Sequence, residues 1–313
     1  MSLSPTPEGP QGLGWLPQLE APARDQWFAS GMPPRFVASA PSTPLPEAFT
    51  LAQHVLWWFN QGQVGSCAGN STTGAVATSI SFASANGPNA LTEVQLSRAY
   101  IYRNGRKLDG LIGRGDGASI TNCLRAVHQF GVCPEDLFPY KPDSRYLDQA
   151  PSAQAVAGAK PFGLTGLADL KFSDAEGIKA SIHAGCPPVI GIWWPYGWDQ
   201  GQIDQWGRTK GIGSGVFGHA LYRIGWVNPG VWDNHLWWHI VNSHGPIYPL
   251  PSEEMRAKVQ GYASARPDRC YSFWCRDDLL QTVAGYGYAE QVAPVGPFSP
   301  QVGGPSSWSG GLS

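Results

Sequence analysis

The order of the hydrophobic patterns along the chain is the strongest constraint on its fold. Helix-type patterns come first, in a run of small residues that begins at Cys67 and in the stretches 91–107, 119–131 and 173–185. Short strand-type runs broken by Gly, Pro and Asn follow, at 187–194, 218–227, 235–244 and 270–280. Helices before strands predict an α+β fold of two lobes, with a cleft where the lobes meet.

Local signals mark the ends of these helices. Ser66 is placed to cap a helix that begins at Cys67, and Gly131 is a stop signal for the helix in 119–131. Ser173 and Glu176 have the spacing of a capping box, which predicts a helix that ends at Gly185. The boundaries of the helical half are therefore expected from sequence alone.

The two ends of the chain differ from its middle. Residues 1–50 are rich in proline and predict an extended N-terminal arm, and residues 291–313 form a Gly/Pro/Ser-rich tail that cannot fold alone. Between them, 51–290 predicts the folded domain, with a helical lobe over about 60–165 and a β-rich lobe over about 166–290. Such arms suit docking onto a larger assembly or a neighbouring subunit.

Charge and hydropathy exclude several classes of partner. The formal net charge of the 313 residues is -2, so a basic surface for nucleic acid is not expected. No apolar run approaches the roughly 20 residues that span a bilayer, and the N-terminus lacks the features of a secretory signal. These features predict synthesis in a cytoplasm. No pattern indicates a cofactor or a metal site.

Six cysteines are too few for a disulfide scaffold in a chain of this length. Cys123 falls on the apolar stripe of a predicted helix and is expected to be a buried free thiol. Cys270 and Cys275 are close enough in sequence either to pair across a turn or to stay free. Cys67 is different, because it follows NQGQVGS and has no apolar neighbours close in sequence.

Cys67 is a candidate nucleophile. At the start of a helix, free N–H groups and the helix dipole stabilise a thiolate and lower the pKa of the thiol. His219, which opens the strand-type run 218–227, is the candidate base, and Asn242 on the next strand could orient its ring. Gln61, six residues before Cys67, could direct its amide at an oxyanion.

Three blocks in this order, QGQVGSC, GHALYRIGW and IVNSHG, resemble the active-site blocks of papain-like cysteine peptidases, most closely those of the bacterial and viral branch. Further stretches, among them GWLPQLEAPARDQW and LSRAYIYRNGR, resemble the same branch, so the resemblance covers roughly residues 12 to 285. In that family the histidine and asparagine follow the cysteine by about 130–150 residues. His219 fits this spacing, and Asn242 lies somewhat beyond it.

The resemblance implies a papain-like two-lobed fold, in which a helical lobe carries the nucleophile and an antiparallel, barrel-like lobe faces it across the cleft. It implies a cysteine endopeptidase, a thiol hydrolase that acts on peptide or isopeptide bonds of a polypeptide. Cys67 would be the nucleophile, His219 the base and acid, Asn242 the orienting group and Gln61 the oxyanion donor.

Three positions depart from the family pattern. Val64 replaces a cysteine that forms a disulfide in many members, and Ala68 replaces the usual aromatic residue after the nucleophile. His244 replaces a tryptophan that shields the Asn–His hydrogen bond, so a wetter bond and reduced activity are expected. No long helical pro-segment precedes the cysteine block, so any latency must come from the short N-terminal arm or a partner.

These departures keep a second hypothesis open. The chain could be a structural or adhesion component of a larger assembly such as a virus (phage) particle, with a papain-like scaffold of weak or no activity. The two hypotheses are compatible, since a particle can carry an enzyme. An open cleft with Cys67 near His219 favours the enzyme.

Other conspicuous motifs have ordinary interpretations. HLWWH spaces two histidines four apart, but no glutamate of a zinc motif accompanies them and the run predicts a strand. The RGD triplet in GRGDGAS lacks the lysine of a phosphate loop and predicts a plain turn. Four tryptophans are expected mainly in the core, with the last two as candidate substrate contacts: Trp193, Trp194, Trp198 and Trp206.

Overall fold

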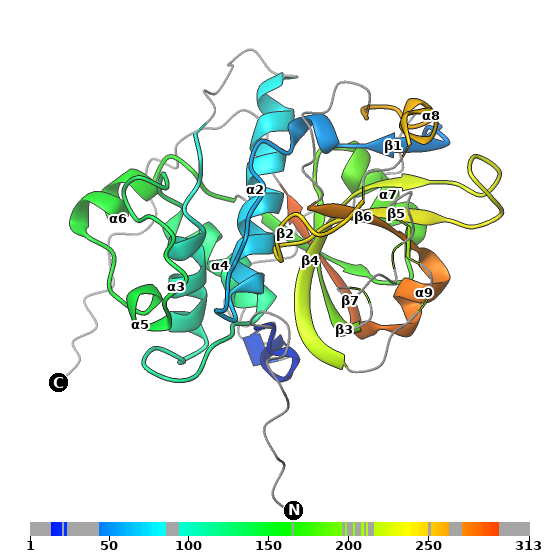
Figure 1. The fold of residues 1–313 in the computed structure, drawn as a ribbon. Helices are drawn as coiled ribbons and strands as arrows, with labels where there is room; N and C mark the ends of the chain where they lie inside the picture. The colour runs from blue at the N-terminus through cyan, green and yellow to red at the C-terminus, as the bar shows by residue number, and fades with distance from the viewer. Residues whose placement is uncertain are drawn as a thin grey trace, which may run out of the picture.

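The computed structural model describes most of the chain between residues 14 and 293. The described residues are 14–20, 22–23, 44–85, 94–164, 166–195, 198, 203, 208–209, 211, 216–249, 252–262 and 271–293. Within them, helices α2 to α6 gather on one side, and an antiparallel sheet with α7, α8 and α9 lies on the other, with the N-terminal residues drawn in dark blue between the two (Figure 1). The predicted α+β order of elements is confirmed.

The helical lobe is built on one long, buried helix. Helix α2 (Cys67–Ala85) stands between helices α3 to α6 and the sheet, with its first residues next to the dark-blue N-terminal segment (Figure 1). Small residues allow neighbours to approach closely on both sides: Gly69 lies against Tyr102, and Gly74 lies against Tyr222. Helix α2 is therefore held by close packing rather than by helix propensity.

Two shorter helices pack beside α2, and five more, α7 among them, follow in the described chain. Helix α3 (Arg98–Leu108) begins at a Ser97 cap, so it starts later than the predicted stretch 91–107. Helix α4 (Ile120–Phe130) begins after Ser119 and ends at Gly131, as predicted. The remaining helices are α5 (Ser144–Leu147), α6 (Ala153–Ala159), α8 (Glu253–Ala257) and α9 (Asp277–Thr282).

Helix α7 (Ala175–His183) corrects one detail of the sequence analysis. Its N-cap is Asp174, whose side chain accepts a hydrogen bond from Gly177 N, whereas Ser173 was predicted as the cap. A carboxylate bonds well to the free N–H groups of a first turn, so the shift by one residue has a simple cause. The predicted end of the helix at Gly185, where φ is 81°, is confirmed.

Seven antiparallel strands form one sheet in the described part of the chain, in the order β2-β7-β3-β4-β5-β6, with β1 also paired to β4. The strands are β1 (Ala48–Thr50), β2 (Gly166–Lys171), β3 (Pro188–Pro195), β4 (Val216–Val227), β5 (Trp237–Val241), β6 (Ser272–Arg276) and β7 (Ala284–Ala293). Strand β4 is central and pairs with β3 and β5, which places Val241 at the end of β5 opposite Tyr222 in the middle of β4.

Parts of both arms belong to the folded structure, and residues 14–20 of the N-terminal arm contact Cys67. Residues 48–50, part of the predicted N-terminal arm, form strand β1 of the sheet. Strand β7 extends to Ala293, a few residues into the predicted tail, and most of both arms lies outside the described residues. A search of the described helices finds none with the length and hydropathy of a membrane span.

Candidate active site

Cys67 is the first residue of α2 and is fully buried. Its Sγ accepts hydrogen bonds from two backbone N–H groups, Ala220 N at 3.4 Å and Gly14 N at 3.3 Å. Ala220 belongs to β4, so the start of the helix and the centre of the sheet meet at this sulfur. The residue before Ala220 is His219, which brings the two predicted reacting groups into one place.

His219 is also fully buried, and its ring has a defined tautomer. Its Nε2 lies 2.7 Å from Asn242 Oδ1, and Ser243 N donates to the same oxygen at 2.7 Å. Because the backbone N–H identifies this Asn242 atom as an acceptor, Nε2 of His219 is the donor and carries the proton. His219 Nδ1 has no hydrogen-bond partner among the described residues, so it remains available as a base.

Asn242 is fixed from several sides. It follows β5 directly, its backbone N–H donates to Tyr271 O at 2.9 Å, and its Nδ2 contacts the hydroxyl of Tyr248. The Asn242 side chain therefore cannot turn without losing contacts on both of its polar atoms. A fixed asparagine in turn holds the imidazole of His219 in one orientation.

Aromatic rings enclose the His219–Asn242 pair. The ring of His244 lies 4.2 Å from that of His219, tilted by 31°, and the indole of Trp194 packs edge-on at 5.1 Å. Trp194 also packs on Trp198 and His244. The expectation of a wetter hydrogen bond is wrong, because Asn242 is 2% exposed and Trp194 shields the pair in addition to His244.

The protonation states of the pair follow from burial. Burial raises the pKa of the Cys67 thiol to about 11, although N–H groups of Ala220, Gly14, Ala68 and Trp15 partly offset it. Burial, and secondly the charge of His244, holds the pKa of His219 well below its usual value. Both groups are therefore neutral near pH 7, and the predicted low thiol pKa is wrong for this conformation.

Cys67 is buried beneath a segment whose position at the site was not predicted from the sequence. The N-terminal segment, residues 14–20, covers Cys67, and backbone N–H groups of Gly14 and Trp15 contact the sulfur. A Cβ on Gly14 would lie 1.6 Å from Gly65 O, so the segment approaches residues 61–66, the cysteine loop before α2, as closely as backbone allows. The stretch GWLPQLE is part of the family resemblance, but its residue pattern does not predict where the segment lies in the structure.

Gln61 lies beside the cysteine loop and is fully buried. Its Nε2 donates to Val64 O at 3.1 Å, and its Oε1 accepts from Ser243 Oγ at 2.6 Å. The second bond joins the cysteine loop to the residue that follows Asn242. Gln61 thus ties together the two lobes beside the reacting groups.

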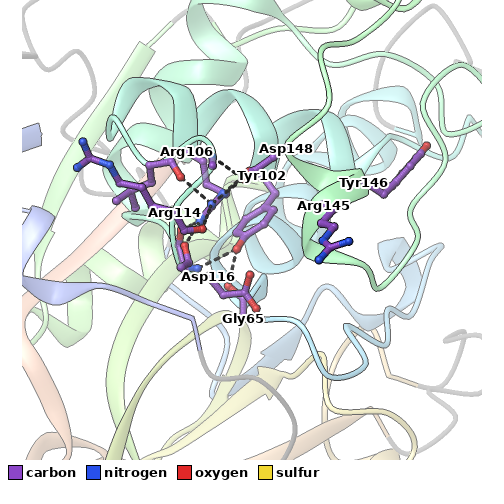
Figure 2. A network of polar contacts seen from close by, with 12 residues as sticks. Gly65, Tyr102, Arg106, Arg114, Asp116, Arg145, Tyr146 and Asp148 are labelled. Atoms are coloured by element: carbon purple, nitrogen blue, oxygen red, sulfur yellow. Dashed lines mark hydrogen bonds and ion pairs between the residues drawn. The ribbon is translucent and has the colours of Figure 1, made fainter.

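A polar network holds the loop between α3 and α4 against the cysteine loop (Figure 2). Tyr102 Oη donates to Gly65 O at 3.0 Å and accepts from Gly117 N at 2.8 Å. The buried guanidinium of Arg106 donates to the carbonyls of Gly115 and Gly117 and pairs with Asp148 at 2.8 Å. The RGD triplet was predicted as a turn; it lies in this loop as a bend directly after the turn at residues 112–113.

The other histidines and cysteines singled out in the sequence are not part of the reacting pair. His235 contacts Asp233, and His239 bonds Thr50 and Ser272 inside the sheet. No group of three or more metal-ligating side chains occurs in the part of the chain that the structure describes. Cys123 and Cys275 are buried free thiols, the first as predicted, whereas Cys270 lies outside the described residues.

The tryptophans divide as follows. Trp194 is buried, as predicted, and Trp198, which was also a candidate substrate contact, is buried as well; both pack on Phe273. Trp193, which was expected in the core, is instead 38% exposed and faces Trp15 of the N-terminal segment at 6.2 Å. Trp206 lies outside the described residues.

A helix that carries a cysteine at its start, against an antiparallel sheet that carries a His–Asn pair, defines the fold of the papain-like cysteine peptidases. Xylellain, a cysteine protease from Xylella fastidiosa, superimposes with a TM-score of 0.64 at 20% identity, over 94% of this chain and all (100%) of that one. Procathepsin B of Trypanosoma congolense gives 0.59 at 13% identity, over 91% of this chain and 87% of its own. Bromelain from Ananas comosus, solved with the E64 inhibitor, gives 0.53 at 14% identity, over 80% of this chain and 100% of its own.

Sequence comparison agrees with the structural one. The chain is 31% identical over 156 residues to an uncharacterised peptidase C1-like protein of Acanthamoeba polyphaga mimivirus, which is 47% of this chain and 47% of that protein. The chain therefore matches about half the length of this curated relative. No family model matches the chain. The predicted papain-like fold and family resemblance are confirmed.

Proposed function

We propose that this protein is a cysteine peptidase that hydrolyses peptide or isopeptide bonds through Cys67 and His219. One observation carries the proposal: Cys67 Sγ lies 3.4 Å from Ala220 N, immediately after a histidine whose Nε2 is held by Asn242. A nucleophile, a base beside it and a group that orients the base are the three parts that covalent catalysis requires. The similarity to papain-like peptidases supports the same assignment.

The reaction divides into two steps. In the first, His219 Nδ1 takes the proton of the Cys67 thiol, and the thiolate attacks the carbonyl carbon of the substrate. The tetrahedral intermediate collapses as the C–N bond breaks, and the leaving amine takes the proton from His219. In the second, water attacks the thioester while His219 takes its proton, and the carboxylic acid and the free thiol are released.

The oxyanion of the intermediate needs donors close to Cys67. The backbone N–H of Cys67 belongs to the first turn of α2 and has no partner within the helix, because helical bonding begins at Asn70 N. Gln61 Nε2, whose bond to Val64 O is 3.1 Å, is the second donor if it turns from that carbonyl to the substrate. Such donors contribute about 10²–10³-fold to the rate.

The proposal is tested by digestion of a defined peptide mixture followed by mass spectrometry. The parent chain is compared with Gly14→Ala, whose methyl group has no room beside Gly65 O and displaces the segment over Cys67. We expect new peptide termini with Gly14→Ala, and none when Cys67→Ala is added. An activated ester should give a burst equal to one acyl group per chain, and an epoxide should label Cys67. Uncut peptides together with an unlabelled Cys67 in both chains would refute the proposal.

Two expectations from sequence remain predictions. Docking of the arms, residues 1–50 and 291–313, onto an assembly or a neighbouring subunit concerns residues most of which lie outside the described ones. Synthesis in a cytoplasm and incorporation in a virus particle are likewise untested. The alternative of a purely structural component gains no support from the described residues, and the digestion experiment separates it from the peptidase.

A further inference from the structure

The guanidinium of Arg98 connects the two segments that flank the cysteine loop. Arg98 is the first residue of α3, and its Nη1 donates to Asn60 O at 3.0 Å and to Asn70 Oδ1 at 3.0 Å. Asn60 directly precedes the loop, and Asn70 lies in the first turn of α2, which begins with Cys67. One side chain therefore holds both ends of the loop that leads to the nucleophile.

The hydroxyl of Tyr140 makes a second connection between the ends of the loop. Its Oη donates to Gln61 O at 2.7 Å, and Ser66 Oγ lies 2.6 Å from it. Because a phenol has one proton and a carbonyl oxygen can only accept, Ser66 is the donor in the second bond. Asn70 Nδ2 donates in turn to Ser66 Oγ at 3.0 Å, so the two connections form one network.

Arg98 also fixes the ring of Tyr140. The guanidinium carbon lies 3.9 Å from the centre of that ring and 4.8 Å from the centre of the Phe59 ring. A guanidinium over an aromatic face is attracted by the ring quadrupole, and its planar shape suits this stacking better than an ammonium group does. The phenol is thereby held where its hydroxyl reaches Gln61 O.

The position of Arg98 is unusual for a charged side chain. Burial lowers its pKa, and the charge of Glu135 offsets this only in part. Its Nε is buried and has no hydrogen-bond partner among the described residues. Since a buried donor without a partner costs stability, its retention indicates a requirement other than stability. The segments that Arg98 contacts, which lead to Gln61 and Cys67, indicate that this requirement lies at the reacting groups.

Both polar backbone atoms of Gln61 are fixed as a result. Its N–H donates to Ser243 O at 2.8 Å, and its carbonyl accepts from Tyr140. The side chain that turns toward the substrate therefore starts from a backbone held on both sides. Oxyanion donors are effective only when they are aimed in advance, and a displacement of about 1 Å costs about 10²-fold in rate.

We propose that Arg98 is a positioning residue for the oxyanion site, which the Gln61 side chain and the Cys67 N–H form. Through the network of Asn70 and Tyr140 it holds the cysteine loop so that both donors point at the substrate oxygen. The catalytic half of this proposal rests on the proposed function. The structural half, that Arg98 holds the loop, concerns only the folded chain.

Amide hydrogen exchange tests the structural half without catalysis. Arg98→Met removes the charge and the hydrogen bonds but keeps an apolar chain over the aromatic rings. Arg103→Met is the matched control, because Arg103 belongs to the same helix and donates to Asn104 Oδ1, beside it in the sequence. Mass spectrometry of peptic peptides should show exchange in residues 60–67 about tenfold faster or more in Arg98→Met, and at the parent rate in Arg103→Met.

Two results of this experiment would overturn the proposal. One is exchange in residues 60–67 at the parent rate in Arg98→Met. The other is faster exchange throughout the chain, β5 included, because Arg98 would then stabilise the whole fold rather than the cysteine loop.

Two reactions of Cys67 are compared to test the catalytic half. Acylation by an activated ester forms an oxyanion, whereas alkylation by iodoacetamide displaces iodide and forms none, although both use the same thiolate. In the Gly14→Ala chain, Arg98→Met should therefore slow acylation about tenfold or more and leave the alkylation rate nearly unchanged. Arg103→Met should change neither rate. Unchanged acylation in Arg98→Met, or equal slowing of both reactions, would contradict a positioning role.

Gln61→Ala supplies a further control in the same background. Loss of this donor should slow acylation about 10²–10³-fold. Adding Arg98→Met should then slow acylation less than it does when Gln61 is present, because one of the two donors to be positioned is gone. Independent effects of the two substitutions would show that Arg98 does not act through Gln61.

The outcomes separate this proposal from the peptidase. Faster exchange of residues 60–67 in Arg98→Met, with no acylation in any chain, would leave Arg98 as the residue that holds the loop. It would refute the proposed function and the catalytic half together. Acylation at equal rates with and without Arg98→Met would refute the positioning role and leave the peptidase standing.

Discussion

Two buried histidines lie on neighbouring strands of the sheet and differ in one respect. His239 on β5 uses both ring nitrogens: Nδ1 lies 2.8 Å from Thr50 Oγ1 and Nε2 lies 2.8 Å from Ser272 Oγ. Its ring is stacked on Trp274 at 4.3 Å. His219 on β4 uses only Nε2, on Asn242, and its Nδ1 has no hydrogen-bond partner among the described residues.

The difference teaches how to tell a structural histidine from a reactive one. A buried polar atom without a partner costs stability, so folds retain it only where something else requires it. His239 is fully satisfied and belongs to the packing of the sheet. His219 keeps one nitrogen unused beside Cys67, which is what a general base needs. The comparison is sharpened or broken by four predictions.

The largest expected effect is on turnover. In the Gly14→Ala background, His219→Gln should lower kcat/KM on a peptide substrate by about 10³-fold or more, because the base that ionises Cys67 is lost. His239→Gln should leave kcat/KM of the folded fraction nearly unchanged. Steady-state assays on both variants, corrected for folded protein by circular dichroism, make the comparison. A similar loss in both variants would remove the distinction between the two histidines.

A smaller loss is expected at the group that orients His219. Asn242→Ala leaves the base present but free to rotate, and misorientation of a reacting group costs about 100-fold. Asn242→Asp should retain more activity, since a carboxylate also accepts from Nε2. The measurement is kcat at saturating substrate. If Asn242→Ala had full activity, the aromatic rings alone would position the imidazole.

Stability at acid pH tests the structural histidine. Burial lowers the pKa of His239 to about 3, against about 6.5 in the unfolded chain. As pH falls from 6.5 toward 3, the unfolded chain takes up a proton that the folded chain does not, so the free energy of unfolding decreases. Urea titrations at pH 6.5 and 5 should show about 1.5 kcal/mol more loss in the parent than in His239→Gln.

The effect of His219 on acid stability is common to both of these chains, and it cancels in the difference. Equal losses in the parent and His239→Gln would mean that the His239 environment accepts a charge. His239 would then no longer be distinguished from His219 by its satisfied, apolar surroundings.

The smallest effect concerns His244. Its charge is the second cause, after burial, of the low pKa of His219, so His244→Phe should raise that pKa while keeping a ring in contact. NMR titration of the His219 ring in the Cys67→Ala chain measures the change. An unchanged or lowered titration point would show that His244 acts on His219 only through packing.

The residues of the site that lie in the three sequence blocks QGQVGSC, GHALYRIGW and IVNSHG could be predicted from the sequence. Cys67 at a helix start, His219 at the beginning of a strand and Asn242 after the next strand all lie where the patterns indicated, because antiparallel pairing of β4 with β5 brings the last two together. Helix α4 with its Ser119 and Gly131 ends was equally predictable from local signals.

The missed features depend on contacts between distant segments. Residues 14–20 have neither periodicity nor a motif that specifies a partner, and only the absence of side chains at Gly117, Gly191 and Gly218 makes room for them. The raised pKa of Cys67 follows from that coverage, so it was equally hidden. Trp194 compensates for His244 through a neighbouring strand, which the IVNSHG block could not reveal.

The pH dependence of Cys67 alkylation tests most directly whether His219, and not His239, serves the thiol. Iodoacetamide rates at Cys67 are measured by mass spectrometry from pH 5 to 10 in Gly14→Ala and in the same chain with His219→Gln or His239→Gln. Gly14→Ala and His239→Gln should react well below pH 8.5, the usual pKa of a thiol, and His219→Gln should react only near or above it. One shared profile for all three chains would contradict the account.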